Sequence, residues 1–155
     1  MEDKIINKNK NCIQRKSKIF EHTNISKDGE DVCIFCKIAK GEIPAEKVYE
    51  DDNFIGILDI NPEMKGHTLV FPKKHFQTIL DTPSSLGNEF LEAIKSVALD
   101  LIKKEKAEGF NVIFNTNKIA HQEVPHVHAH VMPRKTGDQM RLDITGGLRE
   151  KKKKK

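Results

Sequence analysis

Several residue types and patterns are scarce in this 155-residue chain, and each scarcity excludes a class of protein. The sequence has no uninterrupted apolar run of about 18 residues, so we expect no transmembrane segment and no membrane partner. Its three cysteines are too few for a disulfide framework, which favours a reducing compartment, and we expect a cytoplasmic protein. The first twenty residues lack the apolar stretch of a secretory signal, and their acidic residues argue against a transit peptide.

The excess of positive charge is confined to the carboxyl-terminal end, although the net charge of the chain is +4. Residues 149–155 contain six basic side chains and one acidic side chain, which leaves a net charge of −1 on the remaining 148 residues. A lysine block of this kind is usually solvated and disordered. No aromatic residues interleave with it to stack on bases, so we expect no specific nucleic-acid partner.

The distribution of apolar residues divides the chain into three parts. Residues 1–31 are rich in Lys, Asn and Asp and show no helical or strand period, which predicts a flexible polar extension. Apolar periodicity begins at Val32, and we predict a single domain over residues 32–147, followed by a basic tail over residues 148–155.

The clearest periodic pattern lies in the middle of the chain. Its apolar residues fall at offsets of 0, 4, 5, 8, 11, 12, 15 and 16 from Leu86, ending at Ile102. These offsets predict an amphipathic helix whose apolar face packs in the core. Ser84 or Ser85 is a candidate N-cap for this helix, and Gly109 is a candidate stop.

Shorter apolar segments surround the long helix. Apolar residues at positions 34, 35 and 38, closed by Gly41, predict a short helix. Strands are predicted at residues 48–49, 54–59, 67–71, 110–115 and 124–132, with Pro72 and Pro133 ending two of them. The strands cluster before and after the long helix without a βαβ rhythm. This favours an α+β fold with a mainly antiparallel five-stranded sheet, one long helix and one short helix.

Three histidines alternate with apolar residues in the segment His126-Val-His-Ala-His130. Alternate residues of a strand point to the same side and lie about 6.5–7 Å apart, so the predicted strand would present His126, His128 and His130 on one face. A neutral imidazole is a nucleophile toward phosphorus and also a metal ligand, and a row of histidines could also be purely structural. The strict period of two favours a functional site.

The same segment resembles the histidine triad of the HIT superfamily, which has the pattern His-φ-His-φ-His-φ-φ with apolar φ. Three other segments resemble the amino-terminal half of the family at the expected separations: Asp59-Ile-Asn-Pro62, Lys65-Gly-His-Thr-Leu-Val70 and Pro72-Lys-Lys-His75. Asn115, seven residues before Gln122, matches a further family position. The resemblance covers residues 32–134 and implies a HIT-like fold.

The resemblance implies a hydrolase that acts on purine nucleotide conjugates of the AMP type. In this family the middle histidine attacks the α-phosphate, and water then releases the mononucleotide from a covalent nucleotidyl-histidine. By the motif match, His128 is that nucleophile and His130 contacts phosphate oxygens. Gln122 would donate a hydrogen bond to a nonbridging or leaving oxygen.

Nucleotide-binding residues are also implied by the resemblance. Asp59 would accept hydrogen bonds from the ribose hydroxyls, although from local sequence it could instead be a turn-forming carboxylate. Ile60 would pack on the base, and Asn115 would face ribose or phosphate. Backbone N–H groups near Gln122 and Glu123 would stabilise the phosphate charge.

Two positions depart from the family pattern. His121 stands where a glycine often precedes the glutamine, and Glu123 stands where Ser or Thr is frequent. A small residue at the first position lets the phosphates lie close to the backbone, so His121 should affect the loop geometry. We expect Glu123 to alter how the leaving group is protonated, not whether His128 attacks.

Two of the cysteines form a C-x-x-C motif, Cys33-Ile-Phe-Cys36. By itself this motif is compatible with metal binding, redox chemistry or coincidence. Zinc-containing HIT members complete a Cys₂His₂ site with two histidines that match His75 and His126. The resemblance therefore implies a structural Zn²⁺ held by Cys33, Cys36, His75 and His126, and it leaves His67 as a core or supporting residue.

Several functional interpretations stay open. The C-x-x-C start and the Gly-His-Thr-Leu-Val segment resemble the Hint-like and bacterial-type branch, which suggests a nucleoside phosphoramidase or nucleotidyl hydrolase. Residues 133–138 also resemble the fragile-histidine-triad branch, which splits dinucleoside polyphosphates. The alternative class is a noncatalytic interaction module that binds nucleotide and zinc. Family members of this length are commonly homodimers that join their sheets, and we expect a homodimer here.

Overall fold

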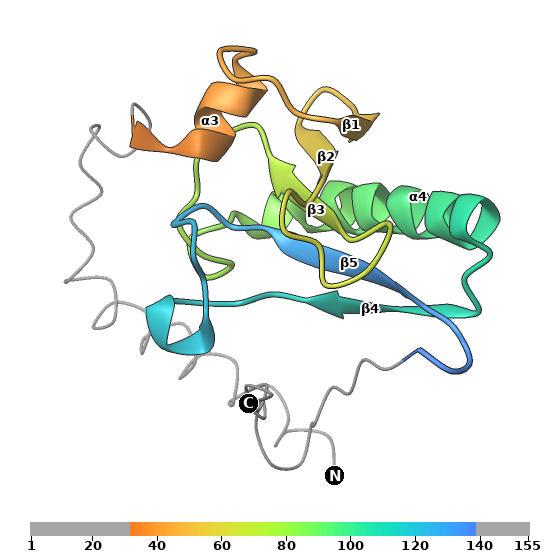
Figure 1. Cartoon of the computed structure of the whole chain (residues 1–155). Coiled ribbons are helices and arrows are strands. Elements are labelled where there is room, and N and C mark those ends of the chain that lie inside the picture. The colour runs from red at the N-terminus through yellow and green to blue at the C-terminus, as the bar shows by residue number, and fades with distance from the viewer. Residues whose placement is uncertain (1–31, 139–155) are drawn as a thin grey trace, which may run out of the picture.

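The computed structural model describes residues 32–138 of the chain (Figure 1). The extension predicted over residues 1–31, the tail predicted over 148–155 and the last part of the predicted domain, residues 139–147, therefore lie outside the described residues. Within the described part, none of the helices combines the length and the apolar character needed to cross a bilayer.

The described residues form one five-stranded sheet in which every neighbouring pair is antiparallel. Its strands are β1 (Lys47–Glu50), β2 (Phe54–Leu58), β3 (Thr68–Pro72), β4 (Gly109–Ile113) and β5 (Ala129–Arg134). The order across the sheet is β1-β2-β3-β5-β4, so β1 and β4 are the edges and β5 lies between β3 and β4. The predicted α+β class with an antiparallel sheet is confirmed.

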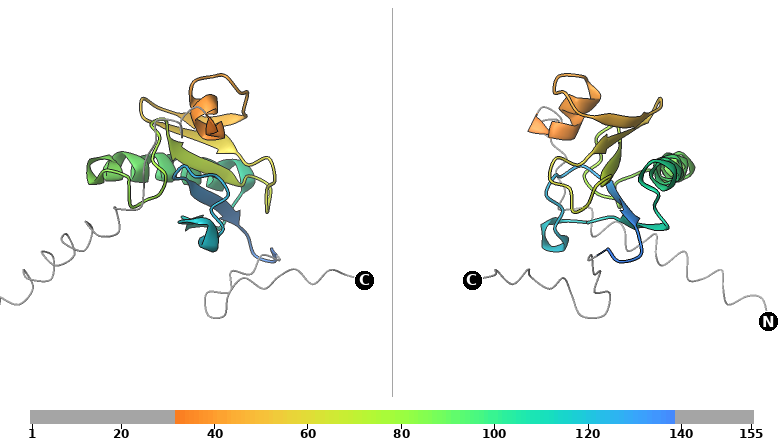
Figure 2. Two further views of the ribbon diagram at one scale, coloured as in Figure 1. Left: turned by 90° about the vertical axis from the view of Figure 1, so that its left-hand side faces the viewer. Right: turned by 45° about the vertical axis from the view of Figure 1, so that its right-hand side comes forward.

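Two α-helices cover opposite faces of this sheet (Figure 2). The long helix α4 (Gly87–Glu105) packs on one face, and the short helix α3 (Ile34–Ala39) packs on the other. Neighbouring residues of a strand point to opposite faces, which is why Phe54 contributes to the α4 core and Ile55 to the α3 core. The 3₁₀ turns η2 (Ser84–Leu86) and η3 (Lys118–Ala120) complete the described elements.

The long helix forms where its apolar period predicts it, but both of its ends differ from the prediction. Neither Ser84 nor Ser85 caps it, because these residues form the 3₁₀ turn η2 that leads into the helix, and Leu86 occupies the N-cap position without a side-chain cap. The helix ends before Lys106, which takes the left-handed conformation with φ of 53°. Gly109 instead begins β4, since sheet pairing already starts at Glu108, whose N–H donates to the Arg134 carbonyl.

The strand predicted over residues 124–132 is shifted toward the carboxyl terminus. Regular pairing begins only at Ala129 and continues through Pro133, which lies opposite Phe110. Pro72 likewise lies inside the last pair of β3. Pro72 is the last residue of β3, so this strand ends at the predicted proline, whereas β5 continues past Pro133 to Arg134. A proline at a strand end loses only an N–H donor and keeps its carbonyl acceptor, so it can be part of the pairing.

The loop before β3 depends on a glycine. Gly66 has a φ of +85°, and a Cβ atom there would lie 3.0 Å from side-chain carbons of Leu101 and Glu105. Only glycine combines this conformation with so close an approach to α4. This close packing fixes the backbone just before His67, the residue that precedes β3.

Candidate active site and metal centre

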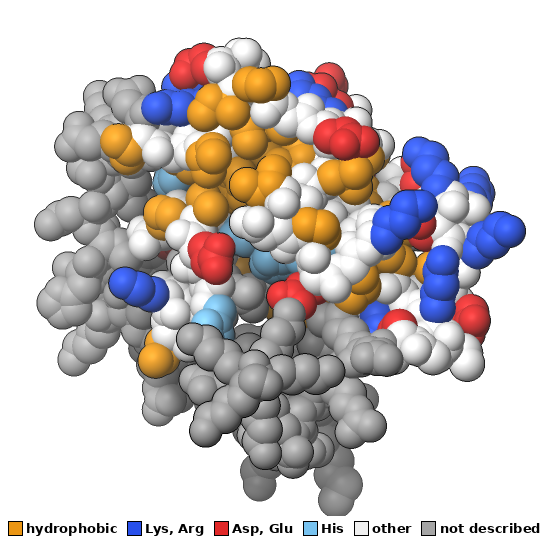
Figure 3. All heavy atoms as spheres, viewed as in Figure 1, with side chains coloured by type: hydrophobic (Ala, Val, Ile, Leu, Met, Phe, Trp, Pro, Cys, Tyr) orange, Lys and Arg blue, Asp and Glu red, His pale blue; other side chains and the backbone are white. Residues whose placement is uncertain are grey.

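The three histidines of the triad segment lie on the α3 side of the sheet. Val127, Ala129 and Val131 alternate with them and are buried in the core beneath α4. The predicted alternation is therefore present, although only His130 belongs to regular strand; His126 lies in a bend and His128 in the irregular backbone that precedes the strand. On the face seen in Figure 3, histidine side chains are visible beside a group of hydrophobic side chains.

His128 is held as a neutral imidazole with one defined tautomer. Its Nδ1–H donates to the backbone carbonyl oxygen of His126 at 2.7 Å, which leaves the lone pair on Nε2. Burial lowers the pKa of His128 below its ordinary value, so the ring is neutral at pH 7. A neutral ring with a free Nε2 lone pair can act as a nucleophile.

His130 is linked to a carboxylate through a second buried histidine. Its Nδ1 lies 3.0 Å from Nε2 of His67, and the two nitrogens share one proton in a hydrogen bond. The Nδ1 atom of His67 accepts the Glu63 N–H at 3.3 Å and lies 3.5 Å from a carboxylate oxygen of Asp59. The rings of His128 and His130 are 4.9 Å apart, so this chain ends beside the candidate nucleophile.

These contacts change the interpretation of Asp59 and His67. The Asp59 carboxylate faces His67 and also accepts the Asn61 N–H at 2.9 Å, so its turn-forming role is present in the structure. His67 is buried and bonds directly to His130, which gives a specific partner to the core or supporting role expected from the sequence. The register gives the physical reason, because Leu69 of β3 pairs with His130 and brings the preceding loop beside it.

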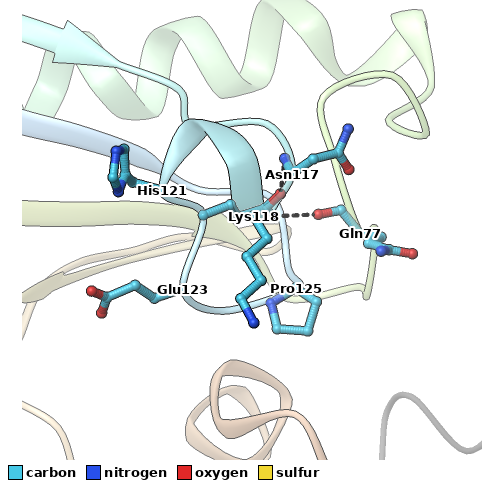
Figure 4. A pocket seen from close by; sticks show the side chains of 7 residues that line it. Gln77, Asn117, Lys118, His121, Glu123 and Pro125 are labelled. Atoms are coloured by element: carbon cyan, nitrogen blue, oxygen red, sulfur yellow. Dashed lines mark hydrogen bonds between the residues drawn. The ribbon is translucent and has the colours of Figure 1, made fainter. Parts of the chain in front are cut away.

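Gln122 lies in the loop before the triad, and its amide is bonded within the protein on both sides. The amide oxygen accepts the Asn117 N–H at 2.8 Å, and the amide nitrogen donates to the Gln77 carbonyl at 2.6 Å. Gln122 therefore ties the η3 turn to the segment that follows β3. It lines a pocket of about 490 Å³ together with Gln77, Asn117, Lys118, His121, Glu123 and Pro125 (Figure 4).

His121 fits this loop because it adopts the conformation that a glycine would take. Its φ of 64° and ψ of 29° lie in the left-handed region, where a histidine is tolerated. The Asn115 amide donates to the His121 carbonyl at 3.4 Å and supports this turn. The side chains of His121 and Glu123 are exposed at the pocket, and Ile60 is 87% exposed on its own loop.

The four predicted metal ligands converge. His126 Nδ1 lies 3.4 Å from the Cys33 sulfur and 3.6 Å from the Cys36 sulfur, and His75 Nδ1 lies 3.3 Å from the Cys36 sulfur. All four ligand atoms lie within 4.8 Å of one another. Zinc–sulfur and zinc–nitrogen bonds of about 2.3 and 2.05 Å at tetrahedral angles would separate sulfur and nitrogen by about 3.6 Å, so the spacing fits a tetrahedral ion.

The tautomer of His126 also fits a metal centre. Its Nε2–H donates to the Pro72 carbonyl at 2.8 Å, so the lone pair on Nδ1 faces the two sulfurs. Burial lowers the pKa of His126 to about 4, which keeps the ring neutral and able to bind a metal. Cys33 lies just before α3 and Cys36 inside its first turn, and this turn brings both sulfurs to one side.

The chain is similar in sequence to a known protein family. The HIT domain profile matches residues 40–137. An uncharacterised HIT-like protein from Methanocaldococcus jannaschii is 47% identical over 107 residues, which are 69% of this chain and 82% of that protein.

Two further relatives carry names that describe an activity. The adenosine 5′-monophosphoramidase of Saccharomyces cerevisiae is 45% identical over 66% of this chain and 63% of its own length. The adenylylsulfatase of Arabidopsis thaliana is 39% identical over 68% of this chain and 54% of its own length.

Solved structures show the same fold. A zinc-bound histidine triad protein from Mycobacterium smegmatis has a TM-score of 0.68 and 41% identity, over 71% of this chain and 80% of that one. A HIT-family protein from Bacillus subtilis has a TM-score of 0.66 and 38% identity, over 68% of this chain and 75% of that one.

The burial of His130 predicts a pH-dependent stability. Burial, and then the neighbouring His128 and His67, lower the pKa of His130 to about 4, whereas the unfolded chain takes up this proton near 6.5. The stabilisation by neutral His130 is therefore full above pH 6.5 and is lost as the pH falls toward 4. With allowance for solvent screening, the loss is on the order of 2 kcal/mol.

Urea unfolding of the wild type and of His130→Gln at several pH values measures this effect. Because the variant lacks this titrating group, the wild type should lose stability relative to it between pH 7 and pH 4. A difference in unfolding free energy that stays constant over this range would contradict the assignment.

Proposed function

Because the chain belongs to the HIT family, we propose that it hydrolyses purine nucleotide conjugates through a covalent nucleotidyl-His128 intermediate. The observation that carries this proposal is the state of His128, a buried neutral ring whose Nδ1–H is bound to a backbone carbonyl. A residue that only bound nucleotide would not need a free Nε2 lone pair. This argues against the alternative of a noncatalytic module that binds nucleotide and zinc.

The reaction has two steps. The Nε2 lone pair of His128 forms a bond to the α-phosphorus while the bond to the leaving group breaks, and the leaving group takes up a proton from solvent as it departs. Water then attacks the same phosphorus and gives up a proton to solvent while the bond from phosphorus to Nε2 breaks, which releases the mononucleotide and restores the neutral ring. His130 would contact the phosphate oxygens, held in place by His67 and Asp59.

The remaining contacts are proposed for residues around the same site. Gln122 would offer its second amide hydrogen to a substrate oxygen, and the backbone near Glu123 would add donors to the phosphate. Asp59 and Ile60 would bind the ribose and the base of the nucleotide, and Asn115 would face ribose or phosphate. The exposure of Ile60 supports this role, because an apolar side chain in solvent gains by covering a base.

Phosphoramidates are the favoured substrates because the yeast relative is named an adenosine monophosphoramidase, as is one from Candida albicans. The Arabidopsis relative, named an adenylylsulfatase, shows that other leaving groups occur among similar proteins. Dinucleoside polyphosphates are the alternative substrates, and turnover of adenosine phosphoramidate against diadenosine polyphosphate distinguishes the two.

Replacing His128 tests the mechanism. His128→Ala should abolish turnover of adenosine phosphoramidate, because no other group supplies the attacking nitrogen. Rapid quench followed by mass spectrometry of the wild type should show an added nucleotidyl mass. His22→Ala is the matched control and should keep both turnover and adduct, since it removes a histidine outside the described residues to which no role is assigned. Wild-type activity in His128→Ala would exclude the mechanism.

We also propose that Cys33, Cys36, His75 and His126 hold a structural Zn²⁺. The ion would link α3 to the triad segment, and it would take no part in the hydrolysis. A reducing compartment such as the cytoplasm would preserve the two sulfurs as ligands.

Elemental analysis tests the metal centre. The wild type should contain about one zinc per chain, and Cys36→Ser should lose most of it together with several kcal/mol of stability. Cys12→Ser removes a thiol outside the described residues and should retain the metal. If the wild type contains almost no zinc and its unfolding free energy does not fall when a chelator is added, the four residues do not form a structural zinc site.

A homodimer is proposed from the β4 edge of the sheet. Among residues 32–138 no strand pairs with the outer side of β4, and its apolar side chains Phe110 and Val112 are 43% and 38% exposed. Pairing of two such edges around a two-fold axis would join the sheets of two chains and cover these side chains.

Light scattering after size exclusion measures the oligomeric state. The wild type should have twice the chain mass of 17.7 kDa, and Val112→Lys should have the mass of a single chain because it places charge in the interface. Leu80→Lys, which changes an exposed apolar residue of a loop, should remain dimeric. A monomeric wild type would overturn the proposal.

A further inference from the structure

Phe35 lies where the short helix, the metal-binding residues and His128 meet. It belongs to α3, between the two cysteines, and is 5% exposed. Its ring contacts the His128 ring edge to face, with centroids 5.2 Å apart and planes at 83°. It also contacts the His126 ring at 5.8 Å and 73°.

One hydrogen bond by itself does not fix an imidazole ring. The bond from His128 Nδ1–H to the His126 carbonyl restrains one end of the ring and leaves the Nε2 end able to tilt about it. Phe35 packs against this ring on one side, and the His130 ring lies 4.9 Å away. The side chain of Phe35 therefore restricts the direction in which Nε2 points.

Phe35 is itself held rigidly. Its ring stacks on Phe71 of β3, with centroids 4.4 Å apart and planes at 11°. Both rings lie in the α3 core, together with Cys33 and Cys36. A side chain fixed on several sides can transmit the position of α3 to the ring it touches.

We propose that Phe35 is a positioning residue for His128, which keeps Nε2 aimed at the substrate phosphorus through edge-to-face packing. This inference rests on the proposed function for its kinetic consequence. It assigns Phe35 no contact with the reacting atoms. Replacing Phe35 should therefore lower kcat, which reports the rate of attack, and should leave KM nearly unchanged.

Phe35→Leu removes the flat ring while keeping a similar apolar side chain. An aromatic pair is worth about 0.5–1.5 kcal/mol, so kcat for adenosine phosphoramidate should fall between about twofold and tenfold, with KM within about twofold of wild type. Phe90→Leu is the matched control, since it truncates an equally buried ring of α4, on the opposite face of the sheet, and should leave kcat unchanged. Phe35→Tyr keeps an aromatic ring at this position and should therefore have a kcat close to that of the wild type.

The kinetic result distinguishes positioning from substrate binding. If Phe35→Leu raises KM while kcat is unchanged, Phe35 contacts the nucleotide and the inference is wrong. If Phe90→Leu lowers kcat as much as Phe35→Leu does, the effect is general loss of stability, and the inference also fails.

A spectroscopic measurement tests the same inference without turnover. The Nδ1–H proton of His128, assigned with His128→Ala, should give a protected NMR signal in the wild type and in Phe90→Leu. It should be broadened or exchanged away in Phe35→Leu, because the ring is no longer held. An unchanged signal in Phe35→Leu would overturn the inference, whereas a wild type that turns over no nucleotide would overturn only the proposed function.

Discussion

His126 joins the metal-binding group to the candidate nucleophile, and the arrangement of the whole site depends on its contacts. Its side chain is fully buried and bonds to the Pro72 carbonyl, so that its other ring nitrogen faces the two sulfurs. Its backbone carbonyl accepts the Nδ1–H of His128. Rotation of this one residue would therefore disturb the metal ligands and the nucleophile together.

Burial sets the chemistry of the histidines as much as it sets their position. Removing an imidazole from water disfavours its charged form, and the pKa values of His126, His128 and His130 are all lowered for this reason. Neutral rings can bind a metal or attack phosphorus, whereas protonated rings can do neither. The apolar residues that alternate with the triad pack in the core beneath α4. They therefore keep the histidines buried, and burial keeps the imidazole rings neutral.

Local sequence predicted the elements better than their ends. The apolar period located α4, but its start and stop were decided by the η2 turn and by pairing between Glu108 and Arg134, which lie far apart in the chain. The triad was predicted as one regular strand, yet pairing with β3 and β4 begins only at Ala129. The segment before it contains a bend at residues 124–126, and its Val127 N–H donates to the Phe76 carbonyl.

The sequence by itself determined the fold class, the family and the identity of the triad, because these follow from short-range periods and from motifs whose residues lie close together in the chain. Tertiary structure alone decided that His67 links Asp59 to His130, that Phe35 packs on His128, and that the Gln122 amide bonds within the protein. These contacts join segments from different elements. Their geometry depends on sheet register and on the packing of α3, and neither can be read from the order of residues along a single segment.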